Sequence, residues 1–105
     1  MPPFNPSLLD TAIHGPVRLG VVAALHIDGP MDFTALKKRL AVTDGGLGLH
    51  LQKLEVVGYI SSHKAFVGRR PKTTYSLTPA GRRAFAKYLD DMQALLDAAR
   101  PESSH

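Results

Sequence analysis

A β-hairpin signal in an otherwise helical sequence is the feature that most restricts how this chain can fold. Two short runs with strand-like composition, GYISSHKAF and KTTYSL, are joined by the stretch from Gly68 to Pro71. Glycine and proline favour a turn in this stretch, which would place Arg69 and Arg70 at its tip in water. The second run also alternates with a period of two, which is typical of a half-buried strand. The sequence therefore predicts a hairpin that carries two arginines at its end.

The hairpin lies within the basic part of the chain. The 34 residues from Val56 to Leu89 contain seven of the chain's 13 Lys and Arg residues and none of its 9 Asp and Glu residues. Exposed cations without neighbouring acids create a positive potential that attracts polyanions. A nucleic-acid backbone is a polyanion that such a surface can bind without any catalytic group, so we expect a nucleic-acid partner.

Length and composition indicate one globular domain. A chain of 105 residues with 44% hydrophobic and 21% charged residues has the ordinary balance of a small folded domain. The absence of cysteine excludes disulfides, thiolate metal sites and a cysteine nucleophile. The five histidines show no helical metal-binding spacing, so we expect no metal site and no cofactor. The N-terminus lacks a signal-type apolar core, and no apolar run approaches the roughly 20 residues that span a bilayer, which favours a cytoplasmic protein without a membrane partner.

The pattern of apolar residues predicts five helices and a minor strand, a mainly α fold with a small β-hairpin (α+β). Ser7 is a candidate cap for a short helix through about His14, and Pro16 begins an apolar helix that ends at the turn of residues 28–30. The remaining elements are a one- or two-residue strand at Met31 and helices at 33–40, about 44–57 and 79–99, capped by Asp32, Thr43 or Asp44, and Thr78. The folded domain is expected to span residues 7–99, with flexible ends at 1–6 and 100–105.

The helix expected at 44–57 combines one buried stripe with little intrinsic stability. Leu47, Leu51, Leu54 and Val57 recur at spacings of four and three, and Gly58 is the expected C-terminal stop. Its first turns contain three glycines, each of which costs up to about 1 kcal/mol relative to alanine. We therefore expect packing, rather than helix propensity, to hold this helix.

The last predicted helix is long enough to need a partner. Its apolar residues step by three and four along about 20 residues, roughly 30 Å, which matches the width of a whole domain of this size. Because its far end would have nothing to pack against in one subunit, a second subunit is the simplest partner. The predicted dimer interface combines this helix with the first one: Leu8, Leu9, Phe85, Tyr88, Leu89, Met92, Leu95 and Leu96.

Three sequence segments together carry a family resemblance: FTALKKRL, LGLHLQKLEVVGYI and KAFVGRRPKTTYSLTPAGRRAF. Their order, helix, tight turn, helix and basic hairpin, resembles the small winged helix-turn-helix transcription regulators related to the MarR and ArsR groups, over most of residues 10–98. The resemblance implies that the helix at about 44–57 enters the major groove of double-stranded DNA, while the wing, residues 64–72, reaches the backbone or the minor groove. The predicted DNA-binding residues are Thr43, Asp44, Gly48, Leu49, Gln52, Lys53, Lys64, Arg69, Arg70 and Lys72.

One departure from the family pattern concerns base readout. Members of the family often carry a hydroxyl residue followed by arginine where this chain has Gly48 and Leu49. Gln52 could still pair with adenine, and Leu49 could contact a thymine methyl group, but few base-reading groups remain. We therefore expect much of the affinity to come from phosphate contacts, with modest sequence discrimination. An alternative for Leu49 is packing against a neighbouring protein surface.

Several other residues have a plain structural alternative. His50 is expected to be a core-edge histidine that is hydrogen-bonded within the domain. The cations at 37–39 could form only a soluble helix face. Arg82 and Arg83 could approach phosphates or pair with acidic residues of a second subunit.

The leading prediction is a homodimeric, sequence-specific DNA-binding regulator that reads half-sites about one helical turn, roughly 34 Å, apart. An enzyme is not expected, because no Ser, His and acid grouping or carboxylate pair gathers on one element. Two alternatives keep the fold. One is a protein-interaction module, and the other is a regulator that senses a small-molecule effector in a pocket at the dimer helices, lined by Tyr88 and Met92.

Overall fold

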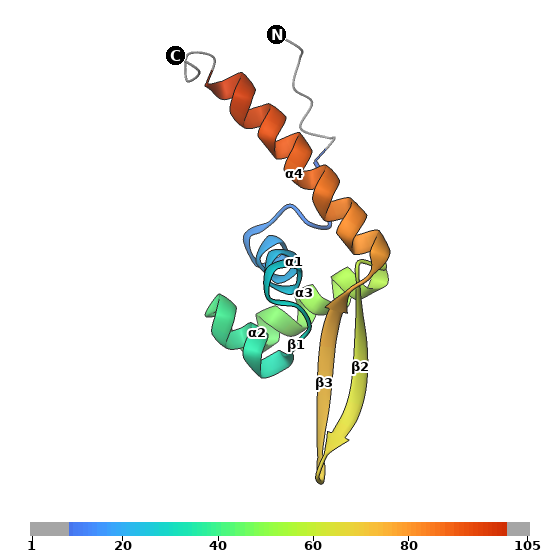
Figure 1. The fold of residues 1–105 in the computed structure, drawn as a ribbon. Helices are drawn as coiled ribbons and strands as arrows, with labels where there is room; N and C mark the ends of the chain where they lie inside the picture. Colours follow the sequence, from blue (N-terminus) through green and yellow to red (C-terminus); the bar gives the residue numbers. More distant parts are fainter. Residues whose placement is uncertain (1–8, 101–105) are drawn as a thin grey trace.

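Helices dominate the structure, and the hairpin lies between the third helix and the fourth (Figure 1). The protein's computed structural model describes residues 9–100. Its elements are α1 (Pro16–Asp28), β1 (Met31–Asp32), α2 (Phe33–Leu40), α3 (Asp44–Val56), β2 (Ile60–Val67), β3 (Arg70–Leu77) and α4 (Pro79–Ala99). The mainly α fold with a small antiparallel sheet is therefore confirmed. The predicted flexible ends, 1–6 and 100–105, lie outside the described residues except for Arg100.

The three strands form one antiparallel sheet with β3 in the centre. β2 pairs with β3 from Ile60 opposite Leu77 to Val67 opposite Arg70, and the short β1 pairs with the other edge of β3. Only the inner end of the hairpin reaches the core. Ile60 and Leu77 are buried, whereas residues 61–72 are all exposed. The outer part of the hairpin is consequently surrounded by solvent.

The hairpin turn is tighter than the sequence predicts. Because Val67 pairs with Arg70, the turn holds only Gly68 and Arg69 instead of the whole stretch from Gly68 to Pro71. Gly68 has a φ of +66°, a left-handed conformation that glycine adopts without steric cost. Strand pairing therefore continues through Arg70 and Pro71, which the sequence predicts to lie in the turn. A connection of two residues is the commonest one in hairpins.

α1 is the buried centre of the domain, as its apolar sequence predicts. Val21 and Val22 are fully buried, and α1 packs against α2, α3, α4 and β3. The other buried apolar side chains are Leu9, Ile13, Ala24, Leu25, Leu36, Leu47, Leu51, Leu54, Ile60, Leu77, Phe85 and Tyr88. Nearly every element therefore contributes to a single core.

The segment before α1 is a turn in its described part, so the predicted helix at 7–14 is wrong there. Asp10 Oδ1 accepts hydrogen bonds from the backbone N–H groups of Ala12 at 2.8 Å and Ile13 at 3.4 Å. Such local bonds from an aspartate compete with helix formation, because they satisfy the backbone in a turn. Ser7, the expected cap, lies outside the described residues, and helical structure starts only at Pro16.

The start of α4 is fastened to the base of the hairpin. Thr78 Oγ1 accepts a hydrogen bond from the Gly81 N–H at 2.9 Å, which confirms the predicted cap, and donates one to the Gly58 carbonyl at 2.6 Å. A Cβ added to Gly81 would overlap the carbonyl oxygen of Tyr59. Glycine at this position therefore allows α4 to lie directly on the chain that enters β2.

The hairpin and the far half of α4 extend from the core in opposite directions (Figure 1). The molecule is consequently elongated, with extents of 58 × 23 × 22 Å. Within residues 9–100, no helix combines the length and the apolar content that crossing a membrane requires.

Candidate nucleic-acid interface

α3 is held in place by its cap and by one buried stripe. Thr43 Oγ1 accepts a hydrogen bond from the Gly46 N–H at 3.4 Å, and Leu47, Leu51 and Leu54 are at most 1% exposed. Val57, the expected fourth member of the stripe, is 48% exposed, so that part of the prediction is wrong. The helix ends before it, because Gly58 adopts a φ of +83° and redirects the chain.

The ridge of α3 opposite this stripe faces solvent. At 3.6 residues per turn, the opposite positions are Gly45, Leu49, Gln52 and Val56, and all four are exposed. Gly48 lies on one flank of the ridge and is exposed as well. A Cβ placed on Gly45 or Gly48 would meet no atom within 4 Å. Packing within the domain therefore gives no reason for glycine at either position.

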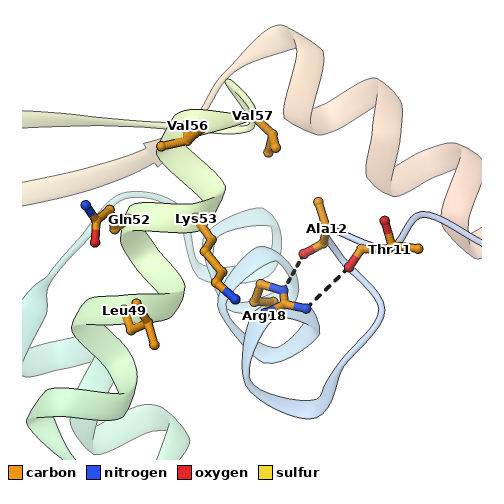
Figure 2. Close-up of a pocket in the computed structure, with 8 residues that line it drawn as sticks. All are labelled: Thr11, Ala12, Arg18, Leu49, Gln52, Lys53, Val56 and Val57. Atoms are coloured by element: carbon orange, nitrogen blue, oxygen red, sulfur yellow. Dashed lines mark hydrogen bonds between the residues drawn. The ribbon is translucent and has the colours of Figure 1, made fainter.

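Two of the α3 residues predicted to bind DNA already have partners within the domain. Thr43 is the N-terminal cap, and Asp44 forms an ion pair with Lys37 of α2 at 2.6 Å. Both side chains of this pair are exposed, so the pair contributes little to stability. Lys37 can therefore easily leave Asp44 for another anion. Lys53 lies on the flank of α3 that faces α1 (Figure 2).

The hairpin presents the four remaining predicted DNA-binding cations, all of them exposed. They are Lys64, Arg69, Arg70 and Lys72. Lys72 forms an ion pair with Asp32 at 3.4 Å, whereas the other three form none within residues 9–100. Asp32 also caps α2, and the hydrogen bond from the Ala35 N–H, assisted by Lys72, lowers the pKa of its carboxyl group. The outer hairpin is therefore a cationic projection, with two acidic neighbours among the described residues: Asp32 at Lys72, and Glu55, which accepts a hydrogen bond from the Ser62 hydroxyl at 2.9 Å.

A groove of about 490 Å³ lies between α3 on one side and, on the other, Thr11 and Ala12 of the turn before α1 together with Arg18 of α1 (Figure 2). Leu49, Val56 and Val57 line it from the side of α3. Lys53 and Arg18 point toward each other from α3 and α1. The groove therefore combines an apolar wall with two cations.

Arg18 connects three segments of the domain, a role that sequence reasoning missed. Its guanidinium donates hydrogen bonds to the carbonyls of Ala12 at 2.7 Å and Thr11 at 3.3 Å (Figure 2), and it contacts His50 Nδ1 at 3.1 Å. Burial, and then the charge of Arg18, lowers the pKa of His50, so its neutral imidazole accepts the bond. The expectation of a histidine hydrogen-bonded within the domain is confirmed. No group of three potential metal ligands gathers around it or elsewhere in residues 9–100.

The turn before α1 is also bonded to two tyrosines from distant parts of the chain. The Tyr59 hydroxyl donates to Asp10 Oδ2 at 2.5 Å, and this bond, with burial, raises the pKa of Tyr59 to about 12. The Tyr88 hydroxyl of α4 lies 2.8 Å from His14 Nδ1. The turn therefore braces α4 against the chain that joins α3 to β2.

Three of the residues predicted for the dimer interface lie in the core of one subunit. Phe85 and Tyr88 are 5% and 2% exposed, and Leu9 is 8% exposed. The first half of α4 packs against α1 and β3, which fills its inward positions. Because these three side chains are covered within one subunit, they leave little surface for a second subunit, and their place in a dimer interface stays a prediction.

The far half of α4 retains the other predicted residues. Leu89 and Leu96 are 47% and 43% exposed, and Met92 and Leu95 are half-buried. Leu8 lies outside the described residues. An apolar stripe thus remains on the part of α4 that extends away from the core.

The order of α2, tight turn, α3 and acid-free hairpin matches a protein family over most of the chain. The family model of the winged helix DNA-binding domain aligns with residues 17–96, from α1 to the far half of α4. This chain belongs to the winged helix DNA-binding family. In this winged-helix protein, the wing of residues 64–72 is the outer part of the β2–β3 hairpin.

Other proteins similar to this winged-helix chain agree with the assignment. The uncharacterized protein MJ0432 of Methanocaldococcus jannaschii is 37% identical over 79 residues, which cover 75% of this chain and 86% of that protein. A transcriptional regulator homologue from Pyrococcus horikoshii OT3 has a similar structure, with a TM-score of 0.78 and 28% identity over 84% of this chain and 87% of that one.

A MarR-family protein from Enterococcus faecalis V583 shares the winged-helix fold. Its TM-score is 0.76 at 21% identity, over 90% of this chain and 86% of that one. The resemblance to winged helix-turn-helix regulators is therefore confirmed, and the fold is also that of this MarR-family protein. Both the family and the fold are those of transcriptional regulators rather than of enzymes.

Proposed function

We propose that this winged-helix protein is a homodimeric transcriptional regulator that binds double-stranded DNA sequence-specifically. α3 would lie in the major groove, and the wing would contact the backbone and the minor groove. The wing is the observation that carries the proposal. It holds four exposed cations, and the chain has no acidic residue between Val56 and Leu89 to oppose a polyanion.

The exposed ridge of α3 supports contact with bases. Gln52 offers the amide that pairs with adenine, and Leu49 offers an apolar contact for a thymine methyl group. Gly45 and Gly48 leave the helix backbone uncovered, so DNA can approach it closely. This chemistry favours A·T base pairs in the half-site.

The apolar stripe on the far half of α4 supports a homodimer. Leu89 and Leu96 are half exposed although they continue the helical spacing of Phe85 and Met92, which face the core of the subunit. Pairing of this stripe with its copy about a two-fold axis would cover it. Two copies of α3 would then meet DNA about one helical turn, roughly 34 Å, apart.

Fluorescence anisotropy with DNA selected from a random pool tests the proposal. With three or four phosphate contacts per subunit, the slope of log K against log salt should be about −5 to −7. Arg69→Ala combined with Arg70→Ala should reduce the size of the slope by about 2 to 4 and weaken binding to all sequences alike. The control is Lys87→Ala, which removes a cation that is paired with Asp91 on α4 and should leave the slope unchanged.

Two results would contradict the proposal. A slope near zero for the wild-type protein would remove DNA as the partner and favour a protein-interaction module with the same fold. Enrichment of sequences without a two-fold motif would remove the homodimer.

Effector sensing is a second candidate, and the groove beside α3 favours it. The groove joins an apolar wall to Arg18 and Lys53, a combination that suits a small aromatic carboxylate. NadR, a structural neighbour with a TM-score of 0.70 and 20% identity, was solved in complex with 4-hydroxyphenylacetate. The groove lies at α3, whereas the sequence suggested a pocket at the dimer helices. 4-Hydroxyphenylacetate should raise the Tm of the wild-type protein but not of Lys53→Met, and equal shifts would exclude the groove.

A further inference from the structure

The end of the wing exposes apolar side chains as well as cations. Phe66 is 71% exposed and Val67 is 63% exposed, although both lie in a regular strand. Pro71 pairs opposite Phe66, and it is exposed too. Phenylalanine is usually buried in folded domains, so its exposure at the tip of a projecting hairpin calls for a partner outside the subunit.

The position of Phe66 indicates the chemistry of this partner. Alternate residues of a strand face opposite sides, so Phe66 and Pro71 share one face of the hairpin with Lys64. Arg69 lies in the turn beyond them, and no acidic residue occurs between positions 56 and 89. Such cationic surroundings would repel a basic partner and attract a polyanion. The charge around Phe66 therefore favours a nucleic acid as the partner.

The shape of the tip suits the minor groove. Paired strand backbones lie about 4.8 Å apart, so the whole hairpin with its side chains is wider than the roughly 6 Å minor groove, and only side chains near its two-residue turn can enter that groove. Proteins that bind the minor groove often insert Phe or Pro side chains between base pairs, which unstacks them and kinks the duplex.

We propose that Phe66 is an apolar wedge that enters the minor groove at the end of the wing and bends the bound DNA. The inference rests on the proposed DNA-binding function and adds a second mode of recognition to it. Pyrimidine–purine steps kink easily, so the wedge favours such a step at a fixed distance from the α3 contact. Sequence discrimination then comes partly from deformability, which offsets the few base-reading groups on α3.

Two measurements on the same DNA separate the wedge from the cations around it. Affinity is measured by anisotropy at several salt concentrations, and bending by energy transfer between dyes at the two ends of the duplex. Phe66→Ala should lose about tenfold in affinity, the loss expected when an aromatic contact to a base is removed. The slope of log K against log salt should stay unchanged, because no charge is removed. The bend, about 20° or more in the wild type, should disappear.

Two further variants make the test specific. Phe66→Leu keeps an apolar side chain that can still wedge, so it should retain most of the bend. Ile27→Ala removes an equally exposed apolar side chain from the end of α1, and it should bind and bend DNA as the wild type does. Circular dichroism confirms that each variant is folded.

The outcomes distinguish this inference from the proposed function. If the wild type binds DNA without bending it, or if Phe66→Ala bends DNA as the wild type does, the wedge is wrong while DNA binding stands. A wild type that binds no DNA would overturn both. Loss of the bend in Phe66→Ala with an unchanged salt slope would establish the wedge.

Discussion

Replacing Gly48 with alanine should stabilise the folded protein. Gly48 is the fifth residue of α3 and lies in its interior, where glycine costs about 0.8–1.0 kcal/mol relative to alanine. The Cβ that the change adds would meet no atom within 4 Å, so no clash offsets the gain. We therefore expect the free energy of unfolding to rise by about 1 kcal/mol, which corresponds to about 4 °C in Tm for a domain of this size.

Urea denaturation followed by circular dichroism measures this gain. The midpoint should rise while the m-value stays constant, because the surface exposed on unfolding hardly changes. Gly81→Ala is the matched opposite case, since its Cβ would overlap the carbonyl oxygen of Tyr59 and should lower the midpoint strongly. A midpoint for Gly48→Ala at or below that of the wild type would refute the claim that the domain itself does not require this glycine.

The same variant should bind DNA less tightly although it is more stable. Its methyl group would stand between the backbone of α3 and the DNA, and an added cost of about 1 kcal/mol corresponds to roughly fivefold in affinity. Gain of stability with loss of affinity is a signature that unfolding cannot imitate. Unchanged or tighter binding would mean that DNA does not approach α3 closely at this position.

Three further changes test the contacts that organise the domain. Tyr59→Phe removes the hydrogen bond to Asp10 and should lower the free energy of unfolding, measured by urea denaturation, by about 1.5 kcal/mol. This is the lower end of the range for hydrogen bonds to charged groups, because the pair is partly exposed. Because the pKa of Tyr59 is raised to about 12, this contribution should be complete below pH 10 and fade as the pH rises through 12, and a pH-independent difference would contradict it. Thr78→Ala removes the cap of α4 and its bond to the hairpin base, and should lower the free energy of unfolding by about 1–2 kcal/mol, whereas an effect below a few tenths would show that water replaces the hydroxyl. Leu89→Glu with Leu96→Glu should convert the protein to a monomer in sedimentation at micromolar concentration without loss of helix content, and an unchanged mass would place the dimer interface elsewhere.

The parts of the fold that depend on local chemistry could be predicted from the sequence. Asp32, Thr43 and Thr78 each cap the helix that follows. At the start of a helix, a short polar side chain can accept a hydrogen bond from the N–H three residues later, whatever the rest of the fold. The hairpin was likewise predictable from its strand-like runs and its glycine. The turn length was not, because it depends on how far the two strands continue to pair.

Contacts between distant segments could not be predicted. Asp10 and Tyr59 are 49 positions apart and follow no periodic pattern, so nothing in the sequence connects them. Phe85 and Tyr88 fit the stripe of an amphipathic helix, but periodicity cannot tell whether the same subunit or a second one covers that stripe. Arg18 left a weak signal, since it is the only charged residue between Pro16 and Leu25.

The joint between α4 and the hairpin has a mechanical consequence for a dimer. Thr78 and Gly81 hold the start of α4 against the carbonyls of Gly58 and Tyr59, so the helix and the wing turn together. In a dimer joined through the far half of α4, the two subunits would then rotate relative to each other as rigid bodies about the point where the two α4 helices cross. A small change in the crossing angle would open or close the distance between the two wings. The spacing of operator half-sites that the protein accepts would therefore be set far from the DNA, by how two α4 helices cross.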